Sequence, residues 1–196
     1  MVGQLLILLV ALLALCAGLT LVYVVTFNGL QTAQTQVVET WSGIEVQLKR
    51  RHQLVPGLVS AVKSAMRHET ALFEKLIEVR NQAEVAMRSG DADEISKQEG
   101  ALSHHLRGVL VQVEDNPAIT ATGNIEAFQK QLEETEDQIA AARRIYNGNV
   151  QNLNARIASF PGNMIAPRHG IRPANSFVLG ESEFEAVYAG PEVALH

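Results

Sequence analysis

The sequence predicts an all-α protein, in which an N-terminal transmembrane helix continues into a long antiparallel helical bundle and an extended C-terminal tail follows. Three observations predict it. An apolar, uncharged run opens the chain, and apolar residues then recur at steps of three and four over most of the remainder. Residues 161–196 hold four of the six prolines and no helical period. We therefore expect an anchor over residues 1–27, a bundle over 28–160 and a tail over 161–196.

The N-terminal run has the length and composition of a membrane span. No residue from Met1 to Val38 carries a side-chain charge, and residues 5–27 are apolar apart from one glycine and two threonines. A helix of that length extends roughly 34 Å, which matches the hydrocarbon core of a bilayer. A cleaved signal peptide is the alternative. It predicts a basic residue before the run and a small-x-small site after it, and the sequence has neither.

Charge and cysteine content restrict the function classes. A net charge of −5 and a pI near 5.7 argue against a nucleic-acid partner, because polyanions bind basic surfaces. Cys16 is the only cysteine, so no disulfide can form within the chain. The lipid bilayer is the first partner that the composition predicts.

The position of basic residues predicts the orientation of the span. Lys and Arg gather on the cytoplasmic side of membrane helices. The segment before the span has none, whereas Lys49, Arg50 and Arg51 follow it. We therefore expect the helical body to lie on the cytoplasmic side.

A helical stripe begins directly after the span and continues for more than 50 residues. It comprises Leu30, Ala33, Val37, Trp41, Ile44, Leu48, Val55, Leu58, Val62, Ala65, Leu72, Leu76, Val79 and Ala83. No strong helix breaker precedes Pro56, so the span is expected to run into the bundle without a loop. Pro56 removes a backbone donor and clashes with the preceding turn, which predicts a kink or a division near residues 53–57. The bundle then has three helices, or four if the first divides at Pro56.

Two further helices follow. Ser89-Gly90-Asp91 combines a glycine stop with capping side chains. A weaker stripe comes next, which comprises Ile95, Leu102, Leu106, Val109 and Val113 and ends at Asn116-Pro117. The strongest pattern begins at Ile125 and comprises Phe128, Leu132, Thr135, Ile139, Ala142, Tyr146, Asn149, Leu153, Ile157 and Phe160. Phe160-Pro161-Gly162 ends it. Leu132 and Ile139 are predicted to lie in the core.

The unequal helix lengths predict a homo-oligomer. The first helix extends roughly 90 Å if it is unbroken and the last about 55 Å, at 1.5 Å per residue. An apolar stripe that its own chain leaves uncovered is commonly covered by a second copy.

The sequence carries no catalytic signature. His68-Glu69 begins like a zinc-protease motif, but Leu72 stands where the second histidine is required. The adjacent residues His104 and His105 point about 100° apart on a helix and cannot share one ion by themselves. No nucleophile elbow or phosphate-binding glycine loop is present. We therefore predict a non-enzymatic protein without a catalytic, cofactor-binding or metal site.

A basic cluster, Lys49-Arg50-Arg51-His52, supplies the candidate contacts. Arg51 interrupts the apolar stripe. One interpretation is a solvated face with an internal ion pair. The other is a fixed contact of Arg50 and Arg51 with a second protomer or partner, since guanidinium groups bind carboxylates bidentately. Glu133 and Glu136 of the last helix are the candidate acidic partners, and Trp41 on the stripe is a candidate contact whose position favours a core anchor over a ligand platform.

Four segments resemble a known family. Residues 41–59, WSGIEVQLKRRHQLVPGLV, are followed in order by Thr135-Glu136, by Ala142-Arg143-Arg144 with Tyr146-Asn147, and by FPGNMIA at residues 160–166. Together they resemble the LemA family of bacterial membrane proteins. The resemblance implies one N-terminal membrane helix, a helical bundle and a place in the bacterial inner membrane, and the family has no established enzymatic activity. The tail departs from the family pattern, since Ser176-Phe177 stands where members commonly keep an aromatic pair.

These observations lead to two functional hypotheses. The first is a non-enzymatic, membrane-anchored scaffold that self-associates through its helices and organises the bilayer or neighbouring membrane proteins. The second is an accessory subunit or adaptor of a separate membrane protease or signalling protein, bound through the basic cluster or the tail.

Overall fold

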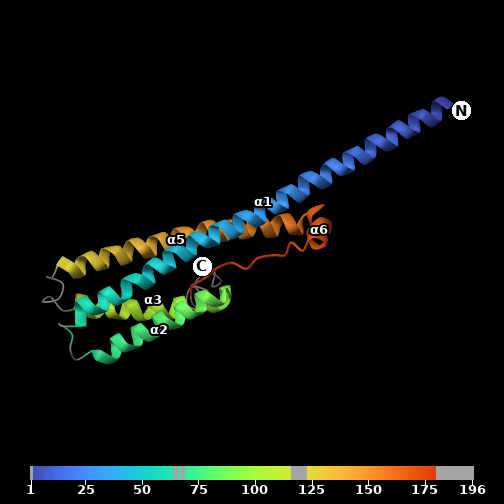
Figure 1. Ribbon diagram of the computed structural model, residues 1–196. Helices are drawn as coiled ribbons and strands as arrows, with labels where there is room; N and C mark the ends of the chain where they lie inside the picture. Colours follow the sequence, from blue (N-terminus) through green and yellow to red (C-terminus); the bar gives the residue numbers. More distant parts are fainter. Residues whose placement is uncertain (1, 64–65, 67–68, 116–122, 180–196) are drawn as a thin grey trace, which may run out of the picture. The chain divides into compact units, whose positions relative to one another are not determined.

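The computed structural model describes residues 2–63, 66, 69–115 and 123–179. No strand is present among them, which confirms the all-α prediction. The elements, shown in Figure 1, are α1 (Val2–Lys63), α2 (Thr70–Ser89), α3 (Ala92–Glu114), α5 (Gly123–Ala158), α6 (Gly162–Ile165) and the 3-10 turn η1 (Ala166–His169). The predicted loop after Asn116, the stripe position Ala65 and the acidic end of the tail, residues 180–196, lie outside the described residues.

The chain divides into two compact units. Unit 1 comprises Met1–Thr40 and Asn147–Ser176, and unit 2 comprises Trp41–Tyr146 and Phe177–His196. Helices α1 and α5 each contribute one part to each unit.

Helix α1 is continuous through the proline that was expected to interrupt it. It runs from Val2 to Lys63 with Pro56 inside, so the predicted continuation of the span into the bundle is confirmed and the division at Pro56 is not observed. Pro56 has no N–H, and the carbonyl of His52 one turn earlier therefore loses its helical partner. Arg80 of α2 replaces it, because its Nε donates to the His52 carbonyl at 3.2 Å. The chain divides after Lys63 instead, and the described residues form four helices of 20 residues or more.

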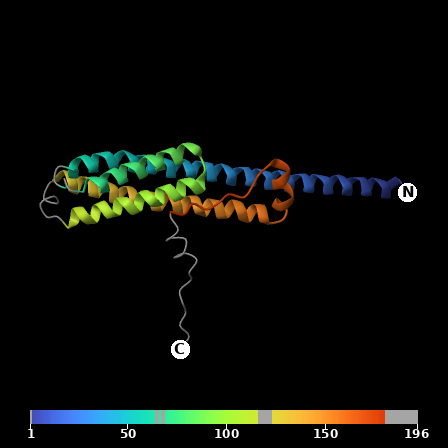
Figure 2. The same cartoon turned by 90° about the horizontal axis from the view of Figure 1, so that it is seen from below.

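A tight turn joins α2 to α3 as its sequence predicts. Gly90 adopts the left-handed conformation, with φ of 73°, that ends a helix without steric cost. The Asp91 side chain then accepts from the backbone N–H groups of Asp93 at 3.0 Å and Glu94 at 3.3 Å. Helices α2 and α3 consequently lie side by side in both views (Figures 1 and 2).

Unit 2 has a continuous apolar core to which α1, α2, α3 and α5 all contribute. Helix α5 runs antiparallel to α1, since Arg51 pairs with Glu136 and Gly57 faces the Phe128 ring. A Cβ atom at residue 57 would lie 2.7 Å from that ring, so glycine permits the close approach. Leu132 and Ile139 are each 1% exposed, which confirms their predicted core positions.

Unit 1 pairs a segment of α1 with the end of α5. Asn149 Nδ2 donates to Thr40 Oγ1 at 3.4 Å, and Arg156 Nη1 donates to the Gly29 carbonyl at 3.5 Å. These contacts again run antiparallel. The buried apolar residues of this unit are Leu30, Ala33, Val37, Val150, Leu153, Ile165, Ala166 and Ile171.

Self-association was predicted on the premise that the chain leaves part of the apolar stripe of α1 uncovered, and this premise is wrong. The stripe of α1 is covered by its own chain beyond the span. Its buried positions are Leu30, Ala33 and Val37 in unit 1, and Ile44, Leu48, Val55, Leu58 and Val62 in unit 2. Self-association therefore stays a prediction without that support.

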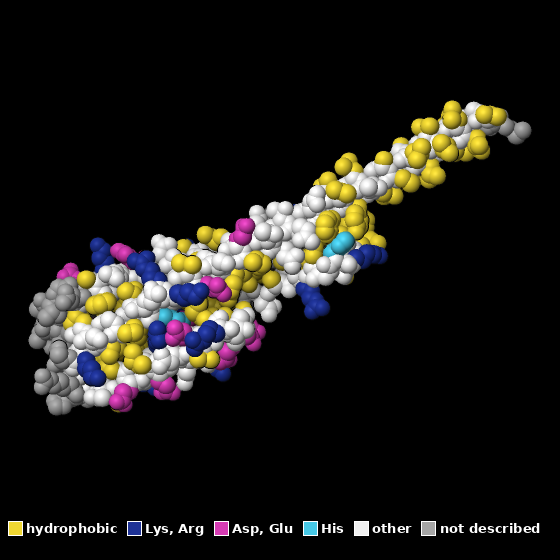
Figure 3. Space-filling view, in the orientation of Figure 1, with side chains coloured by type: hydrophobic (Ala, Val, Ile, Leu, Met, Phe, Trp, Pro, Cys, Tyr) yellow, Lys and Arg dark blue, Asp and Glu magenta, His cyan; other side chains and the backbone are white. Residues whose placement is uncertain are grey.

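Most of the apolar run of α1 is not covered by the rest of the chain. Its large side chains between Leu5 and Val25 are 41% to 72% exposed. By length and composition α1 can cross a membrane, with a mean hydropathy of 3.0 in its most apolar window, and it is the one described helix that can. Figure 3 shows only apolar and uncharged groups on the visible face of this segment.

The segment after α5 is less extended than its sequence predicts. Helix α5 ends at Ala158, close to the expected stop, but α6 and η1 then form two short helical turns. The extended chain begins only after Gly170, whose φ is 68°. Asn154 fixes it to α5, because its side-chain amide both donates to the Ala174 carbonyl at 2.9 Å and accepts from the Ala174 N–H at 3.0 Å. A single turn is too short to produce a recognisable period.

Candidate functional site

A polar core cluster lies inside unit 2. It consists of Arg51 and His52 of α1, Glu99 and Ser103 of α3, and Glu136 of α5. Arg51 occupies a core position because it lies three residues after Leu48 and four before Val55. Glu99 occupies the same kind of position, four residues after Ile95 and three before Leu102. Helical period therefore turns two opposite charges toward the same interior.

The Arg51 guanidinium is held by three residues of its own chain. The side chain is fully buried, and its Nη1 donates to Glu136 Oε1 at 2.6 Å and to Ser103 Oγ at 2.7 Å. Its Nη2 donates to a carboxylate oxygen of Glu99 and to the Glu99 carbonyl. Arg51 Nε is buried and has no hydrogen-bond partner among the described residues. Paired charges of this kind can persist in an apolar core only because nearly every polar group finds a partner.

Glu99 is the most enclosed carboxylate of the cluster. Its side chain is fully buried and bridges Arg51 and His52, since Oε2 pairs with Arg51 and Oε1 lies 2.7 Å from His52 Nε2. Glu136 differs, because its side chain is 41% exposed. The cluster therefore reaches the protein surface at Glu136.

The electrostatics of the cluster favour the ionised pair. Burial opposes charge on both groups. Glu99 and Glu136 nevertheless raise the pKa of Arg51 above its ordinary value, and the hydrogen bond of His52 with the charge of Arg51 lowers the pKa of Glu99. Arg51 and its two carboxylate partners therefore form ion pairs within one chain.

In the polar core cluster, Ser103 accepts a hydrogen bond from Arg51, and His52 pairs with Glu99. Among the described residues, no three or more His, Cys, Asp or Glu side chains are grouped to hold a metal ion. The adjacent residues His104 and His105 form an edge-to-face ring pair with centroids 5.5 Å apart.

The predicted contact residues separate into two kinds. Arg51 and Glu136 form an ion pair within one chain, but Arg51 is fully buried, so the solvated face that the first interpretation placed there is wrong for Arg51. Arg50 is about half exposed and lies 3.9 Å from Glu134, not from either predicted partner. Glu133 is exposed. The assembly role of Arg50, Arg51, Glu133 and Glu136 stays a prediction.

Trp41 is an anchor for the tail. It is half-buried, its Nε1 donates to Glu45 at 2.9 Å, and its ring lies against Tyr146 and edge-on to Phe177, with centroids 5.4 Å and 5.2 Å apart. Phe177 is 1% exposed. The tail residue Phe177 is therefore part of the core of unit 2.

A shallow groove between α3 and α5 opens beside the cluster. It contains two adjoining pockets of about 290 and 350 Å³, which share Ser103, Arg107, Glu136 and Asp137. Glu133 lines one of them. The groove brings acidic side chains of the last helix to the surface next to the buried Arg51.

Sequence reasoning missed Glu99 and Ser103, and it named His52 only as a member of the basic cluster. Glu99 could have been found by the test that singled out Arg51, since it too replaces an apolar residue at a stripe position. His52 and Ser103 lie next to stripe positions and not on them, so the apolar period does not single them out.

The pH dependence of stability is expected to report Glu99. Its folded-state pKa lies below the ordinary value of 4.5, so its stabilisation is complete above that pH and is lost as the pH falls through the folded pKa. We expect the difference in free energy of unfolding between the wild type and Glu99→Gln to be large at pH 7 and to shrink below pH 4.5. Denaturant titrations monitored by circular dichroism measure it. A difference that stays constant down to pH 3 would exclude an ionised Glu99.

The comparisons with known proteins agree with this architecture. Residues 40–193 match the LemA family, a range that includes the polar core cluster, Trp41 and all but the last three residues of the tail. Comparison with curated proteins gave no match. Since the matched range covers most of the 196 residues, the chain belongs to the LemA family.

Proposed function

We propose that this protein is a non-enzymatic scaffold anchored in the bacterial inner membrane by a single helix. Family membership and the apolar helix fit a membrane-associated protein. The continuity of α1 is the observation that carries the proposal. One helix bears an uncovered apolar run in unit 1 and, in unit 2, the core positions that include Arg51. The apolar run and these core positions therefore belong to one continuous helix.

The cytoplasmic orientation of the body is part of this proposal. Besides the basic cluster that follows the span in sequence, Arg156 lies against Gly29, two residues after the apolar run ends. Basic residues next to a span favour the cytoplasmic side. Protease added outside intact cells is therefore expected to leave the helical body uncut. Cleavage of the body while cytoplasmic marker proteins stay intact would show the opposite orientation.

Self-association is the mode of scaffolding that we propose for unit 2. Val46 of α1 and Ile145 of α5 are 60% and 59% exposed, and they offer apolar surface to a second copy. Arg50, four residues after Val46, offers a charge that remains about half exposed. The alternative is an adaptor for a membrane protease or signalling protein. The groove supports it, because Glu133 and Asp137 beside Arg107 would attract a basic segment of a partner, while Glu136 is already paired with Arg51.

Particle mass in detergent separates these functions. We expect the purified full-length chain to form a homo-oligomer in mass photometry, and Arg50→Gln to lower its mass while the circular dichroism spectrum stays unchanged. Lys130→Gln, which removes an exposed charge elsewhere in unit 2, is the control. A monomer that co-purifies with a stoichiometric foreign subunit would favour the adaptor. An Arg50→Gln oligomer of unaltered mass would remove Arg50 from the interface.

A further inference from the structure

The end of α5, α6 and η1 form a corner, residues 156–172, that contacts α1 where its apolar run ends. Tyr23 Oη lies 2.6 Å from His169 Nε2, and the ring centroids of Phe27 and His169 are 4.4 Å apart. Leu30 is the first fully covered residue of α1. If residues 5–27 occupy a bilayer about 30 Å thick, the corner lies at the level of the lipid headgroups.

The corner exposes large apolar side chains although it has a core of its own. Phe160 is 79% exposed and Met164 is 51% exposed, whereas Ile165 and Ala166 of the same turns are buried. An aromatic side chain that is uncovered next to the end of a membrane span is typical of residues that insert at the bilayer interface.

The corner is also basic within an acidic protein. Unit 1 contains three arginines, Arg156, Arg168 and Arg172, against one acid, Glu39, and its net charge is therefore +2 although the whole chain carries −5. All three arginines belong to the corner. No Asp or Glu occurs between Asp137 and Glu181. Anionic lipid headgroups attract such a surface.

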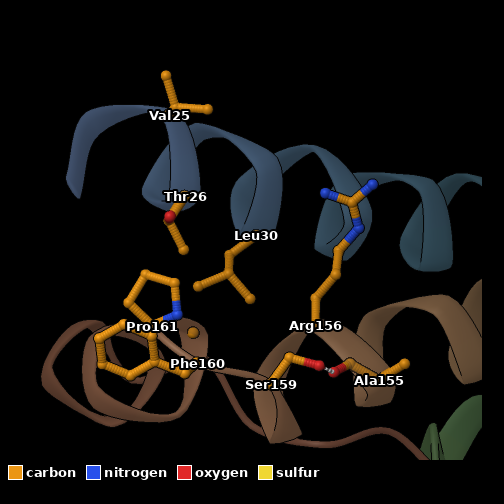
Figure 4. A pocket seen from close by; sticks show the side chains of 9 residues that line it. Val25, Thr26, Leu30, Ala155, Arg156, Ser159, Phe160 and Pro161 are labelled. Atoms are coloured by element: carbon orange, nitrogen blue, oxygen red, sulfur yellow. Dashed lines mark hydrogen bonds between the residues drawn. The ribbon is translucent and has the colours of Figure 1, made fainter. Parts of the chain in front are cut away.

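A pocket combines the apolar and basic groups. It has a volume of about 370 Å³, and Figure 4 shows Leu30 of α1 above Phe160 and Pro161, with the Arg156 side chain extending from α5 toward α1. Arg156 Nε is held by Asn152 Oδ1 at 3.0 Å. The pocket thus offers apolar space for part of a hydrocarbon chain beside the guanidinium of Arg156.

We propose that this corner binds anionic phospholipid at the membrane surface. Phe160 and Met164 enter the acyl boundary, the pocket receives the beginning of one acyl chain, and Arg156 and Arg168 bind the phosphate. A bilayer lipid explains the exposed apolar side chains, which a free phosphate would leave in water. The inference rests on the proposed membrane anchoring and adds a second, peripheral attachment to it.

Fluorescence quenching tests the insertion. The full-length Phe160→Trp variant is reconstituted into phosphatidylglycerol and phosphatidylcholine vesicles that contain acyl-brominated lipid. Wild-type Trp41 supplies the background signal, and Val85→Trp is the matched control, since it is an exposed apolar position on α2 of unit 2. We expect brominated lipid to quench the tryptophan added at position 160 strongly and the one added at position 85 little.

Charge removal tests the headgroup contact. In the triple variant Arg156→Gln, Arg168→Gln and Arg172→Gln, we expect the enrichment of phosphatidylglycerol over phosphatidylcholine around the protein to fall at least about five-fold, the effect of one surface arginine. Native mass spectrometry of protein extracted from mixed vesicles measures the bound lipid. The control replaces Arg88, Arg107 and Lys130 with Gln, which removes the same charge from unit 2.

The outcomes distinguish this site from the anchor itself. A chain that does not float with the vesicles would overturn both the anchoring and the corner. A chain that floats while the tryptophan at position 160 is quenched only by water-soluble acrylamide would overturn the corner alone. An equal loss of bound phosphatidylglycerol in the two triple variants would show that only the total charge of the protein matters. It would overturn specific headgroup binding at the corner. Retained circular dichroism in each variant establishes that the fold is intact.

Discussion

Replacing Arg51 with Met is expected to destabilise unit 2 by about 3 to 5 kcal/mol, because it leaves a buried carboxylate without its cation. Glu99 would keep only His52, and Ser103 and Glu136 would lose their shared donor. Methionine retains much of the side-chain volume, so the loss arises from charge and hydrogen bonding more than from packing. Thermal and denaturant unfolding of the detergent-solubilised chain, followed by circular dichroism, measure it.

Two variants make this expectation specific. Arg50→Met removes the neighbouring guanidinium, which is about half exposed, and surface pairs of that kind contribute about 0 to 1 kcal/mol. The double variant Arg51→Met with Glu99→Met removes both buried charges, and we expect it to recover much of the lost stability, since well-packed apolar residues commonly replace a buried ion pair without loss. Equal stability of Arg51→Met and the wild type would show that the cluster does not hold the bundle together.

Truncation of Leu132 or Ile139 to Ala is expected to cost about 2 to 5 kcal/mol each, since both side chains are almost fully buried and a cavity would remain. Leu132 belongs to the continuous apolar core of unit 2, where α1, α2 and α3 surround it. Melting temperature and denaturant midpoint report the change.

The matched control for these truncations lies in the same unit. Val85→Ala removes a side chain that is 59% exposed, and we expect a change within about 0.5 kcal/mol. If all three variants had the same melting temperature, the stripe of α5 would not be the buried face.

The candidate site could be predicted only in part. Arg51 is recognisable because a charge at a stripe position demands a partner, and Glu136 was among the acids that could supply it. Glu99 lies 48 residues from Arg51 and Glu136 lies 85 residues from it. Which of several acids approaches the guanidinium depends on how three helices are aligned, and no local pattern encodes that alignment.

The break after Lys63 illustrates the same limit. The apolar stripe keeps its phase from Val62 to Leu72, and no glycine or proline separates α1 from α2. Local sequence therefore favours one helix. The chain turns back because Phe73, Leu76 and Val79 of α2 bury their side chains in the same core as Val55, Leu58 and Val62 of α1. Burial of two stripes against each other outweighs the uninterrupted helical preference.

By itself, the sequence determined the features that depend on neighbours within one or two turns: the apolar run, its continuation into α1, the Gly90-Asp91 turn and the core face of α5. These follow from helical period, capping and side-chain polarity, which act locally. The tertiary structure alone decided that α1 passes through Pro56 with Arg80 on the freed carbonyl, that Arg51 joins Glu99 and Glu136, and that α6 and η1 cover α1 at the end of the span. Each of these depends on contacts between residues far apart in the chain, whose energies appear only when the helices pack.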